Sequence, residues 1–405
     1  MGGEKYYPLV KLSDLLKTSI RNGYSPKDVS EWTGLLSLGL GCLTRGGFSP
    51  KQLKNVPDNP HARQFLLFDG DLLMSRANTR ELVGFVGRYR DVGTPCIYPD
   101  LMMRLVPDED KCLSEFLEIA LKSHAIRKEL QADARGTSES MVKVSASVVQ
   151  SLRIPLPPLA EQHRIVAAHA VMERRISALE RVRAKLKVAE AALSAEAFAK
   201  VDSLWPTTRL ENIATVAAGV TLGSEPVGDG TLELPYLRVA NVLDGRIDTA
   251  DLKQVRIMRS QYERFALRKG DLLLTEGGDL DKLGRGAVWD GRIDQCLHQN
   301  HVFRVRCGEE MSPDFLALYT SSDAGRAYFQ RVGKQTTNLA SINSTQVKQM
   351  PVPLPSLTEQ ESLLGPIRSV RSRLAALDRQ VSKLRVVQQG VVEDLLSGGG
   401  TSFAA

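Results

Sequence analysis

Two long stretches of the chain carry an apolar residue at every seventh position, against a background of charged and polar residues. An apolar repeat averaging 3.5 residues over several heptads is typical of helices that pair as a coiled coil. We therefore predict long helices over 156–201 and 354–397, paired as an antiparallel coiled coil. The expected interface residues are Ile165, Met172, Leu179, Leu186 and Leu193 in the first helix, and Leu363, Val370, Leu377, Leu384 and Val391 in the second.

Each of these helices has a second interpretation, as an ordinary amphipathic helix packed on its own domain. In the first helix, His169, Arg183 and Glu190 interrupt the other apolar register and indicate that this face contacts something else. In the second helix, Thr358 and Glu361 have the spacing of a capping box, which predicts the start of a helix at this point.

The regions before each helix show shorter apolar runs bounded by glycine and aspartate, as is typical of strands. We predict strands over 65–68, 271–274 and 302–305, and helices over 113–122 and 313–330. The fold class is therefore expected to be α+β.

An internal repeat divides the chain. The segment Ile154 to Gln162 returns as Val352 to Gln360, and the segment Phe68 to Leu73 returns as Arg268 to Leu273. The opening Val10 to Ser13 also matches Thr208 to Glu211. A repeat this long indicates duplicated domains. We predict two tandem β-rich domains, 1–155 and 202–353, related by a pseudo-twofold axis, and a disordered tail over 398–405.

Composition narrows the class of protein only a little. The 405 residues include 42% hydrophobic and 25% charged residues, an ordinary globular balance, and the net charge of +6 is compatible with a polyanionic partner. The five cysteines form no Cys-x-x-Cys pair, which argues against structural zinc and suits a reducing compartment. No run of 18 apolar residues occurs. We expect a soluble cytoplasmic protein.

The sequence offers no convincing catalytic motif. A glycine-rich cofactor loop, an Asn/Asp-Pro-Pro-Tyr/Phe segment and a phosphate-binding Walker loop are all missing. His298 and His301 have a ligand-like spacing but lack cysteine or acidic neighbours, so we predict no metal site. Asp100 with 109–111 resembles the carboxylates and lysine of a metal-dependent nuclease, but the second copy lacks this pattern. A solvated turn is the preferred interpretation.

Polar and basic loops occur at equivalent places in both halves. Arginine, lysine, asparagine, glutamine, serine and threonine are the side chains that reach DNA phosphates and base edges. These residues are candidate DNA contacts, and plain polar surface is the alternative for each. They are Arg76, Asn78, Thr79, Arg80, Thr137, Ser138 and Lys143 in the first half, and Lys282, Arg285, Lys334, Gln335, Thr336, Thr337 and Asn338 in the second.

Together these features resemble the specificity subunit of type I restriction-modification systems, across essentially the whole chain. The most specific element is the doubled segment at Leu156 to Gln162 and Leu354 to Gln360, each leading into a heptad helix. The segments Ser75 to Gly84 and Glu276 to Gly286 also resemble the target-recognition domains of that family.

The resemblance implies a non-catalytic prokaryotic subunit that reads double-stranded DNA. Each domain would read one half of a split target, and the paired helices would act as spacer and docking surface for two methyltransferase subunits. Restriction subunits would join for cleavage. S-adenosylmethionine, Mg²⁺ and ATP are then expected on the partner subunits, and none on this chain. A coiled-coil scaffold that joins proteins without any nucleic acid is the alternative.

Overall fold

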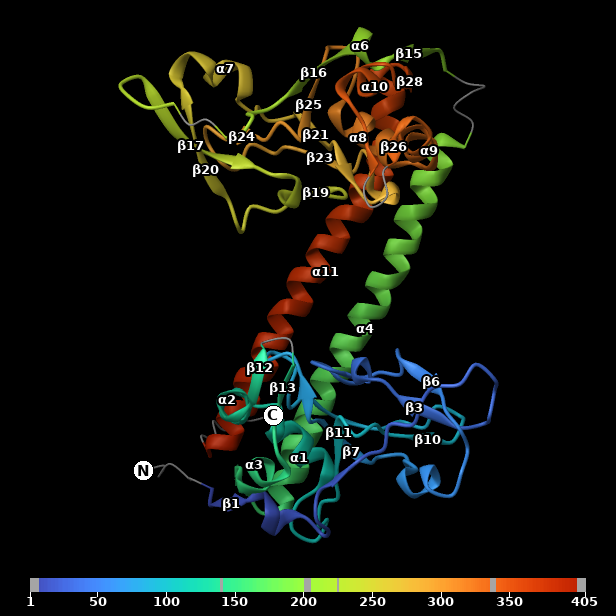
Figure 1. Ribbon diagram of the computed structural model, residues 1–405, viewed down its shortest axis with the longest axis vertical. Helices are drawn as coiled ribbons and strands as arrows, with labels where there is room; N and C mark the ends of the chain where they lie inside the picture. Colours follow the sequence, from blue (N-terminus) through green and yellow to red (C-terminus); the bar gives the residue numbers. More distant parts are fainter. Residues whose placement is uncertain (1–6, 139–140, 200–204, 224–225, 336–339, 399–405) are drawn as a thin grey trace. The chain divides into compact units, whose positions relative to one another are not determined.

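The computed structural model describes residues 7–138, 141–199, 205–223, 226–335 and 340–398. The chain divides into two compact units, Met1–Glu180 with Arg379–Ala405 (unit 1) and Arg181–Asp378 (unit 2). The division falls within the two long helices, so each unit contains part of α4 (Leu159–Phe198) and part of α11 (Leu357–Ser397) (Figure 1). The predicted tail, 398–405, lies outside the described residues apart from Gly398.

Unit 1 combines several small sheets with three short α-helices and its parts of the long helices. Its four-stranded sheet has the order β2-β11-β7-β9, and a three-stranded sheet has the order β10-β3-β6. The strands are β1 (Leu9–Lys11), β2 (Arg21–Asn22), β3 (Leu36–Leu38), β4 (Leu43–Thr44), β5 (Gly47–Phe48), β6 (Leu53–Asn55), β7 (Leu72–Ser75), β8 (Ala77–Asn78), β9 (Val86–Arg88), β10 (Cys96–Ile97), β11 (Met102–Leu105), β12 (Arg135–Ser138), β13 (Met141–Lys143) and β14 (Arg153–Pro155). The short helices are α1 (Ser114–Leu121), α2 (His124–Asp133) and α3 (Ala146–Ser151).

Unit 2 repeats this plan, with a four-stranded sheet of order β16-β25-β21-β23 and a three-stranded sheet of order β20-β17-β24. The strands are β15 (Thr207–Arg209), β16 (Ala214–Ala218), β17 (Thr231–Leu237), β18 (Val242–Leu243), β19 (Arg246–Ile247), β20 (Lys253–Met258), β21 (Leu272–Thr275), β22 (Gly277–Gly278), β23 (Gly286–Val288), β24 (Leu297–His298), β25 (Val302–Cys307), β26 (Lys334–Gln335), β27 (Ala340–Ser341) and β28 (Pro351–Pro353). The short helices are α6 (Leu210–Ile213), α7 (Tyr262–Phe265), α8 (Pro313–Ser321), α9 (Asp323–Val332) and α10 (Ser344–Lys348). The predicted α+β class, with two β-rich regions and long helices, is confirmed.

Two of the local predictions were wrong. The run 65–68 is not a strand: Phe65 and Leu67 bury their side chains in the core, but the segment pairs only through a single bridge between Leu66 and Ile97. The helix predicted over 313–330 is interrupted because the Ser322 side chain accepts a hydrogen bond from the Gly325 N–H (3.3 Å) and starts α9 as a new helix.

The repeated openings and proline-rich segments pair with one another inside each unit. In unit 1, β1 runs antiparallel to β14 with Val10 opposite Ile154. In unit 2, β15 runs antiparallel to β28 with Thr208 opposite Val352. Each proline-rich segment is therefore fixed to the start of its own unit, immediately before the long helix begins.

The repeated Gly-Asp-Leu-Leu segment forms the turn that leads into the central strand of each unit. Gly70 and Gly270 adopt positive φ angles of 94° and 95°, which glycine tolerates without the strain of a side chain. In unit 2, the carboxylate of Asp271 is almost fully buried, accepts a hydrogen bond from the Arg268 N–H (2.7 Å) and pairs with Arg306 (2.7 Å). A buried charge held in this way is tolerated because it is paired and hydrogen-bonded.

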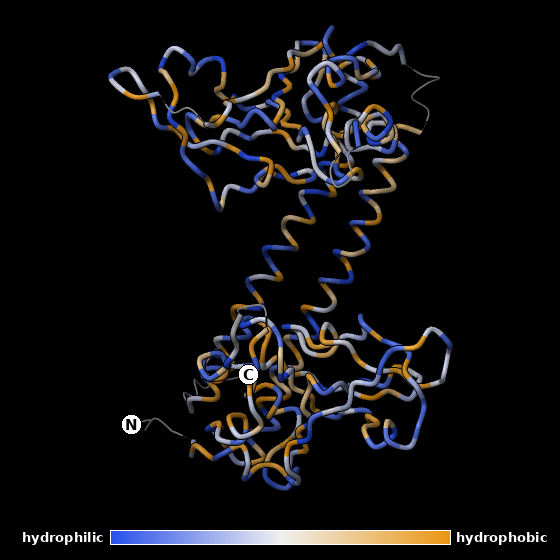
Figure 2. Tube along the Cα trace, in the orientation of Figure 1, coloured by the Kyte–Doolittle hydropathy of each residue, from blue (hydrophilic) through white to orange (hydrophobic). Residues whose placement is uncertain are grey.

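The ends of the long helices belong to the hydrophobic cores of the globular parts. Ile165 of α4 is buried in the same cluster as Val392 and Leu396 of α11, in unit 1. Leu364 and Ile367 of α11 are buried in the core of unit 2. Figure 2 shows apolar residues alternating with polar ones along both helices. The two interpretations of the heptad stretches are therefore both partly correct.

Polar pairs join the two helices in unit 1. The Gln388 Nε2 atom donates to the Glu173 carboxylate (2.9 Å), and Arg385 pairs with Glu180 (2.8 Å). Residue numbers rise along α4 while they fall along α11, so the helix segments run antiparallel, as predicted.

Two of the three polar residues that interrupt the first helix form ion pairs with the other helix, within unit 2. Arg183 pairs with Asp378 (2.5 Å), and Glu190 pairs with Arg371 (2.6 Å). The prediction that this face contacts something other than the partner helix was therefore wrong at these two positions. Ion pairs at half-exposed positions contribute little stability but favour one register.

The capping box of the second helix lies two residues before the predicted one. The Ser356 N–H and hydroxyl both donate to the Glu359 carboxylate (2.8 and 2.7 Å), and the Glu359 N–H donates back to the hydroxyl (3.4 Å). Thr358 already lies inside α11, because Pro355 restricts the residues before it and lets the helix begin at Leu357.

A buried glutamine anchors the start of each long helix. In unit 1, the amide of Gln162 donates to the carbonyls of Lys111 and Pro157 (both 2.9 Å) and accepts from the Leu113 N–H (2.9 Å). Its side chain is fully buried. It therefore ties the first turn of α4 to the loop before α1.

The same three bonds recur in unit 2. The amide of Gln360 donates to the carbonyls of Glu310 and Pro355 (both 2.9 Å) and accepts from the Ser312 N–H (2.8 Å). This glutamine clamp accounts for the repetition of the Glu-Gln pair after each proline-rich segment.

Replacing Gln360 with alanine should destabilise unit 2 by about 3 kcal/mol, because one buried and two partly buried backbone groups lose their partner. Urea unfolding followed by the fluorescence of Trp289, which is buried in unit 2, measures this effect. Gln389→Ala on the exposed surface of α11 is the control. Equal unfolding midpoints for the two variants would show that the clamp contributes nothing.

Candidate nucleic-acid interface

A small three-stranded sheet brings together the two groups of predicted contact residues in unit 1. Its order is β12-β13-β8, with Val142 opposite Asn78 and Lys143 opposite Ala77. The loop after the central strand β7 and the hairpin before the proline-rich segment are far apart in the sequence. Their pairing places candidates from both segments on one edge of the unit.

Unit 2 has an equivalent small sheet of order β22-β27-β26. Gly277 pairs with Ser341, and Lys334 also pairs with Ser341 from the other side. The candidate segments of the second half therefore meet in the same way as those of the first.

The candidates in unit 1 differ in how much of their hydrogen-bonding capacity is free. Arg80 donates to the carbonyls of Gln131 (2.9 Å) and Ala134 (3.5 Å) at the end of α2, which gives it a structural role. Arg76 reaches the Asp100 carbonyl with one long bond (3.4 Å). Thr79 and Lys143 are exposed, Asn78 is half-buried and caps the Thr79 N–H, and nothing is described of the Thr137 and Ser138 side chains within β12.

The candidates in unit 2 divide in the same way. Lys334 and Gln335 are exposed on β26, whereas Lys282 pairs with Asp279 next to it in the sequence. Arg285 is half-buried, and its Nε atom is buried without a hydrogen-bond partner. Thr336, Thr337 and Asn338 lie outside the described residues.

The residue immediately before the first strand of each small sheet carries opposite charge in the two units. In unit 1 it is Arg76, whose backbone N–H bonds the Leu101 carbonyl; in unit 2 it is Glu276, whose N–H bonds the His301 carbonyl. The carboxylate of Glu276 contacts the imidazole of His301 (2.5 Å). A shared backbone therefore presents different hydrogen-bonding groups in the two units.

The predicted coiled-coil residues lie on the inner faces of the long helices to different depths. Ile165 is fully buried in the core of unit 1, and Leu193 and Leu363 pack against the core of unit 2. The others are half-buried: Met172, Leu179, Leu186, Val370, Leu377, Leu384 and Val391.

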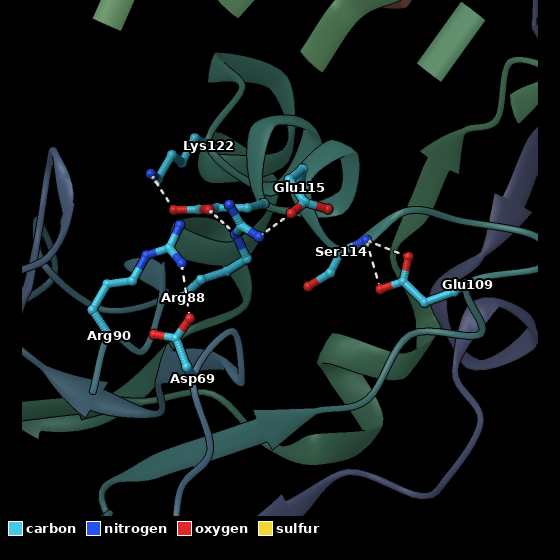
Figure 3. Close-up of polar contacts among 8 residues, drawn as sticks. Asp69, Arg88, Arg90, Glu109, Ser114, Glu115 and Lys122 are labelled. Carbon is cyan, nitrogen blue, oxygen red and sulfur yellow. Dashed lines mark hydrogen bonds and ion pairs between the residues drawn. The ribbon is translucent and has the colours of Figure 1, made fainter. Parts of the chain in front are cut away.

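The residues of the nuclease-like segment support the fold. The Glu109 carboxylate accepts from the Ser114 N–H (3.2 Å) at the start of α1 (Figure 3), and Asp108 pairs with Lys111 (2.9 Å). In the same view, Arg88 pairs with Glu115, and Lys122 points to the adjacent carboxylate. Within the described ranges, no three His, Cys, Asp or Glu side chains form a group suited to a metal ion.

The histidine pair of unit 2 is split between the interior and the surface. The Nδ1 atom of His298 contacts the Val302 carbonyl (2.7 Å), and burial lowers the pKa of His298 to about 4. His301 is half-exposed beside Glu276. His298 is therefore a neutral core residue that donates from Nδ1 to a carbonyl.

Sequence reasoning missed Arg127 and Arg326, which lie at the same place in helices α2 and α9. Each follows the serine at the N-cap position of its helix by four residues: the Arg127 N–H bonds the Ser123 carbonyl, and the Arg326 N–H bonds the Ser322 carbonyl. The repeated Ser-x-x-x-Arg spacing could have revealed them.

The long helices and the short ones described here all lack the combined length and apolar character needed to span a bilayer.

Comparisons with known proteins agree with this architecture. A family model described as the type I restriction modification DNA specificity domain matches residues 48–188. The EcoKI specificity subunit of Escherichia coli is 22% identical over 88% of this chain and 79% of its own length. The putative MjaX specificity subunit of Methanocaldococcus jannaschii is 24% identical over 41% of this chain, and the match spans only 39% of that relative.

The chain is therefore similar to type I restriction-modification specificity subunits over most of its length. Solved structures support the fold of this family. The crystal structure of a type I S subunit from M. genitalium shares a TM-score of 0.53 at 15% identity, covering 98% of this chain and 97% of that one. A second solved chain comes from a structure that describes the assembly and conformational transition of the type I R-M system. Its TM-score is 0.55 at 17% identity, and the match covers 97% of this chain and 98% of that one.

Lowering the pH should destabilise unit 2 through His298. An unfolded histidine takes up a proton near pH 6.5, whereas burial delays protonation of the folded side chain to about pH 4. The unfolded state therefore binds the proton first, and the free energy of unfolding should fall by about 3 kcal/mol between these pH values.

His298→Asn keeps a donor for the Val302 carbonyl and removes the titrating group. Urea midpoints from Trp289 fluorescence at several pH values should fall less in this variant than in the wild type. His163→Asn, an exposed position on α4, is the control. An unchanged pH dependence in His298→Asn would contradict the assignment.

Proposed function

We propose that this chain is the sequence-reading subunit of a type I restriction-modification complex, with one half of a split DNA target read by each unit. The observation that carries the proposal is the recurrence of the small sheet in both units, with different polar side chains on the same backbone. Base edges in the major groove are distinguished by patterns of donors and acceptors, so a shared frame with different side chains suits two different half-sites.

The paired helices are proposed to act as the spacer between the half-sites and as the docking surface for two adenine methyltransferase subunits. Because the glutamine clamps fix both helices to the globular parts, a second half-site binds with high effective concentration only at the permitted separation. Restriction subunits are proposed to join the same complex in the cytoplasm of a prokaryote. S-adenosylmethionine, Mg²⁺ and ATP would bind the partners, and this chain would supply recognition without catalysis.

Matched alanine variants test the assignment of one half-site to each unit. Lys143 and Lys334 are exposed lysines on the small sheets of unit 1 and unit 2. A wrong base pair should cost the wild-type complex with methyltransferase about 1–3 kcal/mol of binding free energy. Lys143→Ala should reduce this cost in one half of the target, and Lys334→Ala in the other half.

Fluorescence anisotropy with a panel of single-substitution duplexes measures these costs, and each variant serves as the control for the other. Loss of discrimination in the same half for both variants would contradict the proposal. A complex that binds no duplex DNA with or without its partners would favour the protein-scaffold alternative.

A further inference from the structure

A cavity of about 240 Å³ lies in unit 2 beside the loop between β22 and β23. Three basic side chains, two hydroxyl side chains and one carboxylate line it. They are Lys282, Arg285, Arg326, Thr320, Ser321 and Asp244. All belong to unit 2: Lys282 and Arg285 lie in the loop between β22 and β23, Asp244 in the turn between β18 and β19, and the others on α8 and α9.

Most of the polar groups around the cavity already have partners. Arg326 pairs with Asp244 (2.6 Å) and donates to the Ser321 carbonyl (2.8 Å). Lys282 pairs with Asp279. The hydroxyls of Thr320 and Ser321 donate to carbonyls within α8 (3.1 and 3.0 Å). Their protons are therefore not available to a ligand.

Arg285 is the exception among these groups. Its Nε atom is buried and has no hydrogen-bond partner, and its guanidinium forms no ion pair with the residues that the structure describes. Because a buried Nε is shielded from any ligand, the donors that Arg285 offers to an acceptor are the terminal N–H groups of its half-buried guanidinium. The cavity thus contains one arginine charge without a described partner.

The equivalent place in unit 1 carries different side chains. Phe85 corresponds to Arg285, since the Ser75 and Thr275 N–H groups bond the carbonyls of Phe85 and Arg285 respectively. The guanidinium of Arg127, the counterpart of Arg326, lies 4.5 Å from the centre of the Phe85 ring and donates to the Val83 carbonyl (2.5 Å). An aromatic ring therefore takes the place of Arg285, beside an arginine that has a hydrogen-bond partner.

We propose that the cavity of unit 2 binds one phosphate group of the DNA backbone, held by Arg285. This inference rests on the proposed function, because it assigns a backbone contact to the same recognition surface. A phosphodiester carries one negative charge and matches the one arginine that lacks a partner. Its oxygens accept the planar N–H donors of a guanidinium. Unit 1, with Phe85 in place of the arginine, makes no such contact.

Salt dependence of binding measures this contact directly. The full chain with its methyltransferase is titrated with a target duplex and with an unrelated duplex of equal length, between about 50 and 200 mM salt. Arg285→Ala should weaken binding to both duplexes about tenfold. The slope of log K against log salt should become shallower by about 0.9, the value expected for one lost phosphate. The preferred target sequence should stay the same.

Three further variants separate the phosphate contact from a general effect on folding or charge. Arg285→Lys keeps the charge and should recover part of the slope. Arg285→Phe reproduces the arrangement of unit 1 and should behave like Arg285→Ala while unfolding at the wild-type midpoint. Arg292→Ala removes an exposed arginine that pairs with Asp290 outside the cavity (2.6 Å), and should leave the slope unchanged.

Substituting single phosphates with neutral methylphosphonates locates the contact. At one position in the target, the methylphosphonate should weaken binding by the wild-type complex and leave binding by Arg285→Ala unchanged. An unchanged slope in Arg285→Ala would overturn the proposal, and so would a loss confined to particular base pairs, which would make Arg285 a reader of bases.

Calorimetric titration with inorganic phosphate distinguishes the other source of the same chemistry. Binding of free phosphate to the wild type but not to Arg285→Ala, with equal DNA affinities, would also overturn the proposal. Failure of the wild-type complex to bind any duplex would overturn both this inference and the proposed function. Failure of the Arg285 tests in a complex that still binds its target would overturn this inference alone.

Discussion

A buried side-chain amide at the start of each long helix is the contact on which the rest of the structure depends. Gln162 and Gln360 are fully buried, and each bonds three backbone groups, one of them buried and two partly buried. The long helix therefore leaves its globular part from a fixed point and in a fixed direction. In each unit this fixed start comes directly after the proline-rich strand that pairs with the opening of the unit.

The duplicated frame separates what is constant from what varies. The turns at Gly70 and Gly270, the pairing of the openings with the proline-rich segments, and the glutamine clamps are the same in both units. The side chains on the frame differ: Arg76 corresponds to Glu276 and Phe85 to Arg285. Constant backbone with variable polar groups is the arrangement that two different DNA half-sites require.

Most of the fold could be predicted from periodicity and repetition, because heptads and duplicated segments extend over many residues of the sequence. Local capping was less accurate: Ser356, and not Thr358, caps the second helix, since the choice depends on where Pro355 lets the helix start. The partners of Arg183 and Glu190 could not be predicted, because they depend on how the two helices align. The small sheets could not be predicted either, because they join strands of two to four residues from segments that are far apart in the sequence. The structural role of Arg80 could not be predicted for the same reason, since its partner Gln131 lies on α2, far along the sequence.

The central proposal is that each unit reads one half of a split DNA target, so that neither unit suffices by itself. Mapping the methylated adenines in cells that express this chain with its methyltransferase tests it most directly. The account predicts one motif made of two specific parts, separated by a non-specific gap of constant length. A contiguous motif, or two parts separated by a variable gap, would contradict it.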